Sequence, residues 1–348
     1  MRDRAELRRA FAQQTEFARS PLYCVLSQVV AGHERLLDLA GRGRPGQYPT
    51  FLFFGAVHEL LLGGADHPLA EFYPSVAGPS ARPAAEAGPA LVSFCAAYET
   101  ELTKIISTRL VQTNHVQRAL GLRLGLSTIA AEVPGPAHLI EVGASAGLIL
   151  RFDRYGYRVG GRQYGDPGSP VQLTAEHYGS GPLPDLDVLP RVASVTGVDL
   201  NPVDIQDPGA RRWLEALVWP ENQDQRELLT AALAVVAADP PVIHRGDAID
   251  VLPDLAAALP AGRPRVVFHA ATRMHVPAQC LDAFDSAILS VGATGPMWWL
   301  SVEDSPEPDP RPAPARPGPV LRLRRPDGFT RTVAVVNGHL RWIETLPR

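Results

Sequence analysis

The sequence has almost no lysine. Lys104 is the only one among the 33 basic residues of this 348-residue chain, which leaves 33 minus 1, or 32, arginines. A Walker phosphate loop, a protein kinase and a pyridoxal phosphate enzyme each require a lysine at a defined place. Lys104 lies in a segment of helical periodicity without a glycine-rich loop, so all three classes are excluded.

Cysteine is also scarce. Cys24, Cys95 and Cys280 are far apart, so their spacing predicts neither a disulfide framework nor a CxxC metal site. The sequence contains no HExxH motif and no carboxylate cluster with metal-ligand spacing. We therefore expect no metal and a reducing, cytoplasmic location.

The sequence also lacks long runs of like charge and long runs of apolar residues. No run of five or six like charges occurs and the net charge is −4, which argues against nucleic acid as a partner. No uninterrupted apolar stretch approaches the roughly 18 to 20 residues that a membrane-spanning helix needs. We expect no membrane partner, and homodimerisation stays open.

Residues 1–132 are predicted to form an all-helical N-terminal domain. Asp3 with Glu6 is typical of a helix cap, for a helix running to about Arg19, and Ser20-Pro21 is typical of a second start. Apolar segments with helical period follow at about 50–62 and 89–131. No strand pattern interrupts this part of the chain.

Residues 133–348 are predicted to form an α/β domain with a Rossmann-like parallel sheet that ends in an antiparallel hairpin. Short apolar runs predict strands at 137–142, 193–198, 242–244, 265–269 and 297–302. Helical patterns at about 208–218, 224–238 and 278–290 lie between them, which favours a sheet covered on both faces.

The last part of this domain alternates apolar and polar residues at 320–324, 330–336 and 339–343. Asp327-Gly328 and Asn337-Gly338 lie between these runs and predict hairpin turns. The segment at about 157–190 is predicted to be an insertion, and the proline-dense segment 305–319 is predicted to be a stiff loop.

A glycine-rich turn follows the first predicted strand and precedes a predicted helix. It comprises Glu141, Gly143, Ala144, Ser145 and Gly147. Glycines allow a tight turn and the close approach of a ligand to the backbone. An acid at a strand end suits a cationic cofactor better than a pyrophosphate. A tight turn that binds nothing is the alternative.

The pattern E-x-G-x-x-x-G resembles the first motif of class I S-adenosylmethionine-dependent methyltransferases. The resemblance implies that the glycines pass under the adenosyl and methionyl parts of the cofactor and that Glu141 faces its amino end. Ser145 is a departure, because a glycine commonly stands at that position.

The same turn also fits G-x-S-x-G, the nucleophile elbow of an α/β-hydrolase, with Ser145 as nucleophile. That fold needs several strands before its elbow, whereas about 130 helical residues come first here. Asp247 or Asp285 with His339 would complete a triad in the required order. A serine hydrolase is therefore the rival prediction.

Acidic residues end the next two predicted strands. In T-G-V-D-L-N-P, Asp199 is placed to accept hydrogen bonds from both ribose hydroxyls of a nucleoside, with Leu200 beside it. In H-R-G-D-A, Asp247 and Ala248 resemble the third methyltransferase motif, which reads the adenine amino group. Helix capping is the alternative role for both acids.

His269 ends the fourth predicted strand, where the sulfonium methyl group would lie. It is the candidate base or substrate-orienting group, and a buried structural histidine is the alternative. His275 and Glu303 are further candidates for substrate contact, although Glu303 precedes a proline-rich loop and also suits a solvated position.

Together these motifs resemble the uncharacterised actinobacterial family called domain of unknown function 2332. The resemblance covers most of the chain and implies a methyltransferase-like fold without an assigned reaction. It includes Q-T-N-H at 112–115, where His115 replaces the glutamate of the family pattern and becomes a candidate substrate residue. Other matching segments lie at 141–148, 153–155, 168–171, 197–204, 217–220, 245–248, 267–269 and 338–342.

We therefore predict an S-adenosylmethionine-dependent methyltransferase with a small-molecule substrate. The helical domain is expected to cover the cofactor and shape the acceptor pocket. A serine hydrolase and a non-catalytic cofactor-binding protein of the same fold are the two alternatives. The predicted cofactor-binding residues are Glu141, Gly143, Ala144, Ser145, Gly147, Asp199, Leu200, Asp247 and Ala248, with His269 as the catalytic residue.

Overall fold

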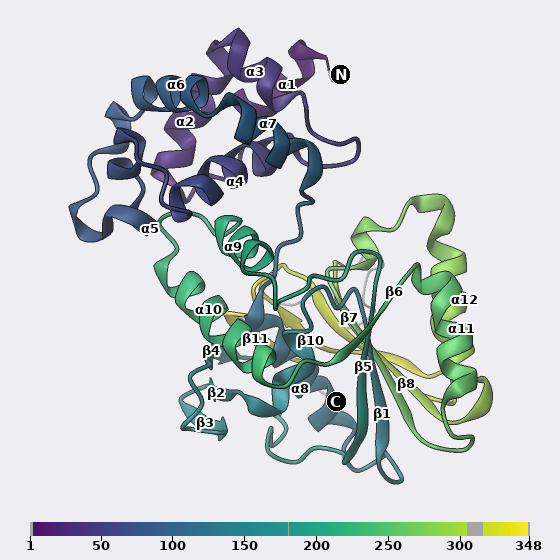
Figure 1. Cartoon of the computed structure of the whole chain (residues 1–348). Helices are drawn as coiled ribbons and strands as arrows, with labels where there is room; N and C mark the ends of the chain where they lie inside the picture. The colour runs from purple at the N-terminus through teal and green to yellow at the C-terminus, as the bar shows by residue number, and fades with distance from the viewer. Residues whose placement is uncertain (1–2, 180, 305–315, 347–348) are drawn as a thin grey trace. The chain divides into compact units, whose positions relative to one another are not determined.

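The computed structural model describes residues 3–179, 181–304 and 316–346. The chain forms two compact units, one made of Met1–Thr113 with Gln206–Thr230 and the other of Asn114–Ile205 with Ala231–Arg348 (Figure 1). Each unit is thus assembled from two separate segments. The division falls at Thr113, earlier than the boundary at 132 that the sequence suggested, and most of the predicted loop at 305–319 lies outside the described residues.

Packing explains why the chain from residue 114 belongs to the second unit and why residues 206–230 belong to the first. A Cβ atom at Gly125 would lie 2.7 Å from Leu300, so the helix that carries Gly125 packs closely on the sheet. A Cβ atom at Gly55 would lie 2.9 Å from the Trp213 ring, so the segment after residue 206 packs on the N-terminal helices. The two glycines allow these close approaches.

The first unit is helical. Asp3 and Ser20 cap the first two helices through their side chains, as predicted, but the first helix ends at Ala12 and not near Arg19. The helices of this unit are α1 (Arg4–Ala12), α2 (Pro21–Gly32), α3 (Glu34–Ala40), α4 (Pro49–Leu62), α5 (Pro74–Ala77), α6 (Gly88–Ala97), α7 (Glu99–Thr108) and α9 (Pro208–Ala216). Helix α10 (Gln223–Ala238) begins in this unit and ends in the other.

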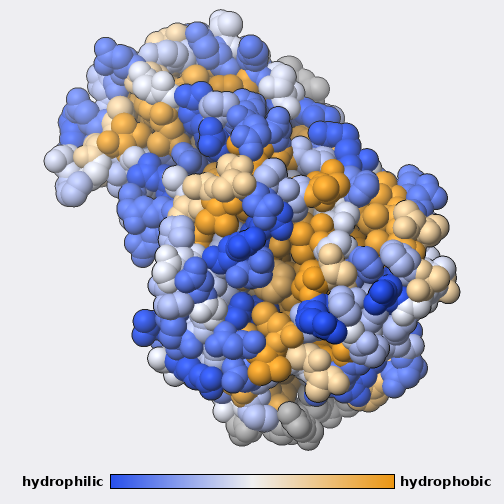
Figure 2. Space-filling model, turned by 60° about the horizontal axis from the view of Figure 1, so that its bottom comes forward, coloured by the Kyte–Doolittle hydropathy of each residue, from blue (hydrophilic) through white to orange (hydrophobic). Residues whose placement is uncertain are grey.

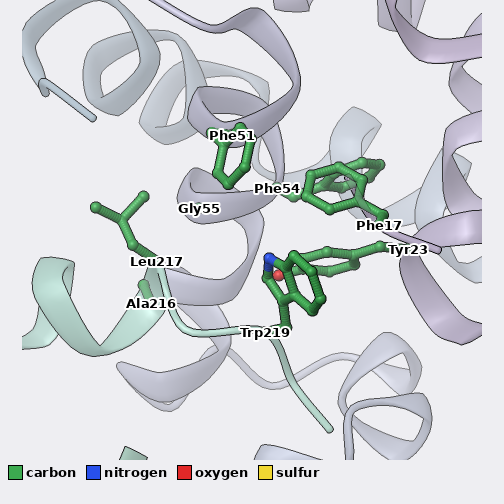
Figure 3. Close-up of a pocket in the computed structure, with 8 residues that line it drawn as sticks. All are labelled: Phe17, Tyr23, Phe51, Phe54, Gly55, Ala216, Leu217 and Trp219. Carbon is green, nitrogen blue, oxygen red and sulfur yellow. The ribbon is translucent and has the colours of Figure 1, made fainter. Parts of the chain in front are cut away.

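A small aromatic pocket lies in the helical unit (Figure 3). Its interior has room for about one water molecule. The rings around it pack on one another, with Tyr23 and Phe54 stacked at 4.6 Å and Phe17 edge-on to Trp219 at 5.8 Å. We interpret the pocket as a gap in an aromatic core. Its lining residues are Phe17, Tyr23, Phe51, Phe54, Gly55, Ala216, Leu217 and Trp219.

The second unit is α/β, as predicted. Its described residues form an eleven-stranded sheet in the order β3-β2-β4-β11-β10-β9-β8-β7-β1-β5-β6. The core is a parallel set at the predicted positions, β1 (Ala137–Val142), β5 (Val192–Asp199), β6 (Val242–Arg245), β7 (Arg265–Ala270) and β8 (Met297–Glu303). The predicted antiparallel hairpins follow as β9 (Val320–Arg324), β10 (Thr330–Val336) and β11 (Trp342–Thr345).

The predicted insertion extends the sheet. It contains β2 (Gly156–Val159), β3 (Arg162–Gly165) and β4 (Gln172–Tyr178), and β4 pairs in parallel with β11. Alternating buried and exposed residues along β4 are typical of a strand with one covered face.

Helices cover the central strands. Helices α11 (Ala248–Ala258) and α12 (Leu281–Ser290) share an apolar core with Ile140, Val142 and Val267 of β1 and β7. Helix α8 (Ala119–Ile129) packs on β8. On the face seen in Figure 2, hydrophobic patches are interspersed among hydrophilic residues, which is ordinary for a folded surface.

The helix predicted after Gly147 is not an α-helix. Only a six-residue 3₁₀ segment, Ile149–Arg154, follows the turn, and Arg151 within it has non-helical dihedral angles. Strand β2 begins two residues later, and the Tyr155 hydroxyl donates to the carbonyl oxygen of Leu148 at 2.7 Å. The chain therefore turns back to the sheet too early for an α-helix, and no helix dipole supports a ligand at this turn.

Candidate active site

The carboxyl ends of β1, β5, β7 and β8 lie along one edge of the sheet. Strand β1 lies between β5 and β7. The strand order reverses there, because β5 and β6 lie on one side of β1 while β7 and β8 lie on the other. In open parallel sheets, ligands bind at the carboxyl ends of the strands beside such a reversal of strand order. The predicted residues on β1, β5 and β7 therefore lie near the edge where a ligand is expected, with Glu141 and Asp199 on one face of the sheet and His269 on the other.

The glycine turn after β1 is held by other parts of the protein. Gly143 and Gly147 have φ angles of 79° and 73°. A Cβ atom at Gly143 would lie 2.4 Å from the Thr272 hydroxyl oxygen, and one at Gly147 would lie 2.5 Å from Pro241. These glycines are explained by internal packing, and a ligand is not needed to account for them. Ala144, also predicted to bind cofactor, is buried.

Asp199 fixes this turn to the end of β5. Its carboxylate accepts the Ser145 backbone N–H at 2.8 Å on one oxygen and the Asn201 N–H at 2.7 Å on the other. Asp207, and not Asp199, caps the following helix α9. Each oxygen of Asp199 keeps a second lone pair, so the carboxylate can still accept hydroxyl donors.

Glu141 is a buried carboxyl group near Asp199. It is 2% exposed, and its Oε2 atom has no hydrogen-bond partner among the described residues. Burial, and secondly the charge of Asp199, raises the pKa of Glu141 well above its usual value. Glu141 pairs with Gly197, two residues before Asp199, so both acids belong to the same face of the sheet.

The end of β6 adds a third acid close to Asp199. The Gly246 N–H donates to the Asp199 carbonyl oxygen at 3.0 Å. Asp247 caps α11 by accepting the Ile249 N–H at 2.9 Å, which is the capping role considered as its alternative. Ala248 is buried, whereas Leu200 is 61% exposed and offers a free apolar surface.

His269 lies behind Glu303 and is completely buried. Its Nδ1 atom is 2.7 Å from Glu303 Oε1, and its Nε2 atom has no hydrogen-bond partner among the described residues. The rings of Phe284 and Trp299 lie beside it, 5.7 and 5.8 Å away between centroids. In this position His269 orients Glu303 and presents no atom to an open space.

Glu303 collects three donors on one oxygen. Its Oε1 atom accepts from His269, from the Thr272 N–H at 2.8 Å and from the Arg273 N–H at 3.0 Å. Burial alone would raise its pKa, but the His269 hydrogen bond and charge and the two N–H groups lower it overall. Glu303 is therefore ionised, and its Oε2 atom makes none of these bonds.

The loop after β7 completes the site, although no motif in the sequence marks it. The Thr272 hydroxyl donates to the Val142 carbonyl oxygen at 3.1 Å, and Ala271 has a φ of 51°. Arg273 forms a two-pronged ion pair with Asp285, at 2.9 and 3.1 Å. This loop thus connects the ends of β1 and β8 through Thr272 and Glu303.

The structure does not assemble the predicted hydrolase triad. The Ser145 hydroxyl accepts from the Asn114 amide at 3.2 Å. Asp285 is paired with Arg273 and Asp247 caps a helix, as described above. The His339 ring stacks on His115 at 4.1 Å between centroids. Each triad candidate has another role in the fold.

The remaining substrate candidates lie in different settings. Burial, followed by the charges of Arg118, His339 and Arg341, lowers the pKa of His115 well below its usual value. His115 is therefore neutral at physiological pH. His275 is exposed at the end of the short 3₁₀ segment Arg273–His275.

Neither a metal centre nor a membrane span is found among the described residues. No group of three or more His, Cys, Asp or Glu residues within 3–179, 181–304 and 316–346 is arranged to hold a metal ion. In the same ranges, no helix has the length and apolar character needed to span a bilayer.

The fold and the site define an α/β protein with acidic side chains at the reversal of strand order. Residues 5–345 match the model of the family described as "Uncharacterized protein conserved in bacteria (DUF2332)", and the chain belongs to this family. A search of curated proteins found no match. One similar solved chain is that of a "DhpI-SAM-HEP complex", with 13% identity, 65% of this chain and 85% of that chain covered, and a TM-score of 0.20. At that TM-score the likeness carries no argument.

Proposed function

We propose that this protein is a methyltransferase that uses S-adenosylmethionine and acts on a small molecule. The proposal depends on one observation, the pair of acids at the ends of β1 and β5. Glu141 and Asp199 belong to the same sheet face, and Glu141 keeps a buried oxygen without a partner among the described residues. A cationic ligand or a hydrogen-bond donor would offset the energetic cost of burying the Glu141 carboxyl group and its repulsion by Asp199.

S-adenosylmethionine fits this set of residues because it carries a cationic sulfonium and ammonium group together with ribose hydroxyls. Asp199 would accept the ribose hydroxyls, and the exposed Leu200 would contact the adenine ring. Glu141 would face the amino end of the methionyl part. Asp247 and Ala248 would lie at the adenine edge. When bound, the cofactor supplies an electrophilic methyl group.

For methyl transfer, the protein mainly has to position the acceptor against the cofactor and exclude water. In methyl transfer the acceptor atom would take the methyl group, the cofactor sulfur would keep the electron pair of the broken carbon–sulfur bond, and the acceptor would release its proton to a nearby base. His269 is fully buried, so we assign it a positioning role through Glu303.

Serine hydrolysis is less well supported. The Ser145 backbone N–H is committed to Asp199, and the hydroxyl accepts from Asn114 rather than contacting an imidazole. A cofactor-binding protein without catalysis shares the whole cofactor site, and it would bind S-adenosylmethionine without producing any methylated product.

Calorimetric titration with S-adenosylmethionine tests the proposal. Asp199→Ala should weaken binding roughly tenfold to a hundredfold, the usual loss for hydrogen bonds to a charged group. Asp254→Ala is the matched control, since Asp254 is an exposed acid on α11, and it should bind like the wild type.

Asp199 also holds the Ser145 turn, so Asp199→Asn is a second variant that keeps one oxygen acceptor in place. It separates loss of charge from collapse of the turn, and thermal unfolding checks that each variant is folded. No heat with the wild type, or equal affinity in all the proteins, would contradict the proposed function.

A further inference from the structure

Arg118 is a half-buried arginine that the proposed cofactor site does not use. Its guanidinium makes no hydrogen bond and no ion pair with any residue in the described ranges. Arg123, on the same stretch of chain, pairs with Asp187 at 2.8 Å and lies over the Tyr157 ring at 4.6 Å. A partly buried guanidinium without such a partner is available to bind an anion.

Arg118 immediately precedes α8 and lies level with Glu303, at the carboxyl end of β8. Cβ atoms at Gly121 and Gly125 would lie 2.9 Å from Val302 and 2.7 Å from Leu300, so α8 runs antiparallel to β8. Arg118 precedes Gly121 by nearly one helical turn. The backbone of Arg118 therefore lies at the level of Glu303, whose side chain alternates with Val302 and belongs to the other face of the sheet, beside His269.

The segment that carries Arg118 is held firmly. The side-chain amide of the preceding residue, Gln117, donates to the carbonyl oxygens of Thr174 at 2.9 Å and Leu340 at 3.1 Å. Arg118 is thus positioned by its neighbours while its own head group makes no bond to the described residues. This combination is typical of a side chain that is pre-arranged for a ligand.

The charges around Arg118 favour an anion. Burial lowers the pKa of Arg118, and the negative charge of Glu303 partly offsets this. The two side chains sense each other without forming an ion pair. Arg341 contributes a second positive charge, since Arg118 and Arg341 both act on His115. Glu303 Oε2, which accepts none of the three donors on Oε1, is an acceptor atom at the same end of β8.

We propose that Arg118 and Glu303 together bind the methyl acceptor, a small acid that carries a hydroxyl or amine. Arg118 holds its carboxylate or phosphate group, and Glu303 Oε2 accepts a hydrogen bond from the O–H or N–H that becomes methylated. Glu303 then takes the proton as the carbon–sulfur bond breaks and sulfur keeps the electron pair. The assignment to the acceptor rests on the proposed methyl transfer, whereas anion binding by Arg118 does not.

Inorganic phosphate is a suitable probe, because it offers both a negative charge and an O–H group. Its binding to the full chain is followed as the rise in thermal midpoint with phosphate concentration at constant ionic strength. We expect Arg118→Ala to raise the apparent Kd roughly tenfold to a hundredfold, as for a lost charged hydrogen bond.

Arg158→Ala is the matched control. Arg158 is an exposed arginine on β2, and its removal changes the net charge equally, so this variant should bind phosphate like the wild type. Arg118→Lys should bind with intermediate affinity, because it keeps the charge and loses the planar fork. If Arg118→Ala does not fold, Arg118→Gln replaces it.

A wild-type midpoint that does not respond to phosphate, or an Arg118→Ala variant that responds like the wild type, would overturn this proposal. The calorimetric titration with S-adenosylmethionine separates it from the proposed function. If the wild type gives no heat with the cofactor while phosphate binding still depends on Arg118, the methyltransferase proposal fails and the anion site stands.

Discussion

The ends of β1 and β8 each carry a glutamate that is buried or nearly so, and the two have opposite pKa shifts. Glu141 has a raised pKa and an oxygen without a partner among the described residues, whereas Glu303 has a lowered pKa and three donors on one oxygen. Both are at least largely enclosed, so burial alone does not decide which of them is charged.

The loops that follow the strands make the difference. After β1, the N–H groups of Gly143 and Ala144 donate to the Val198 carbonyl oxygen, so they are not offered to Glu141. After β7, the N–H groups of Thr272 and Arg273 both point to Glu303. A carboxylate that receives N–H groups is charged before any ligand arrives, whereas one without them needs a donor from elsewhere.

Glu303→Gln is expected to have the largest effect on this comparison. The amide loses the charge that strengthens three hydrogen bonds, so the free energy of unfolding should fall by about 2 to 3 kcal/mol at neutral pH. Urea unfolding measures this change. A loss of stability no greater than that of an exposed control such as Asp254→Asn would break the comparison.

His269→Phe is expected to have an intermediate effect. The phenyl ring keeps most of the volume but removes the donor to Glu303, which should cost about 1 to 2 kcal/mol. The pKa of Glu303 should also rise, so the acid-induced loss of stability should begin at higher pH than in the wild type. A purely structural role for His269 would lower stability without moving that midpoint.

Glu141→Gln is expected to have the smallest effect at low pH, because Glu141 is protonated there and the amide resembles the neutral acid. The pKa of Glu141 in the folded protein is raised above the ordinary 4.5. Its favourable contribution to the free energy of unfolding is therefore complete below pH 4.5 and is lost as the pH rises through the folded pKa. The stability of the variant relative to the wild type should therefore increase with pH.

The contribution of Glu303 to stability depends on pH in the opposite direction. Its folded pKa is lowered below 4.5, so its contribution is complete above that value and is lost as the pH falls through the folded pKa. The difference between the wild type and Glu303→Gln should shrink in acid. Curves of unfolding free energy against pH with the same slope for both variants would contradict the assigned protonation states.

The framework of the sheet could be predicted from the sequence because its signals are local. The five central strands are short apolar runs, and the turn after β1 contains glycines that this backbone requires. The strand predicted at 339–343 starts later, at Trp342, because Leu340 adopts a φ of 49° and Asn337 holds a turn there. Helix α11 was not predicted, although Asp247 was recognised as a potential cap.

The contacts of the site could not be predicted in the same way. The pairing of His269 with Glu303 depends on the register of β7 with β8, in which His269 lies opposite Ser301. Arg118 becomes noticeable only once α8 is seen to run along β8. The candidate site residues that were missed are Arg118, Thr272 and Arg273. Tertiary packing determines their positions, and no spacing in the sequence reveals them.

The chain passes between the two units three times, near residues 113, 205 and 230. Helix α9 completes the helical unit from a distant part of the sequence, with Trp213 against Gly55. Neither unit therefore corresponds to one uninterrupted stretch of the gene. Recombination at a single breakpoint therefore cannot exchange one unit and leave the other whole.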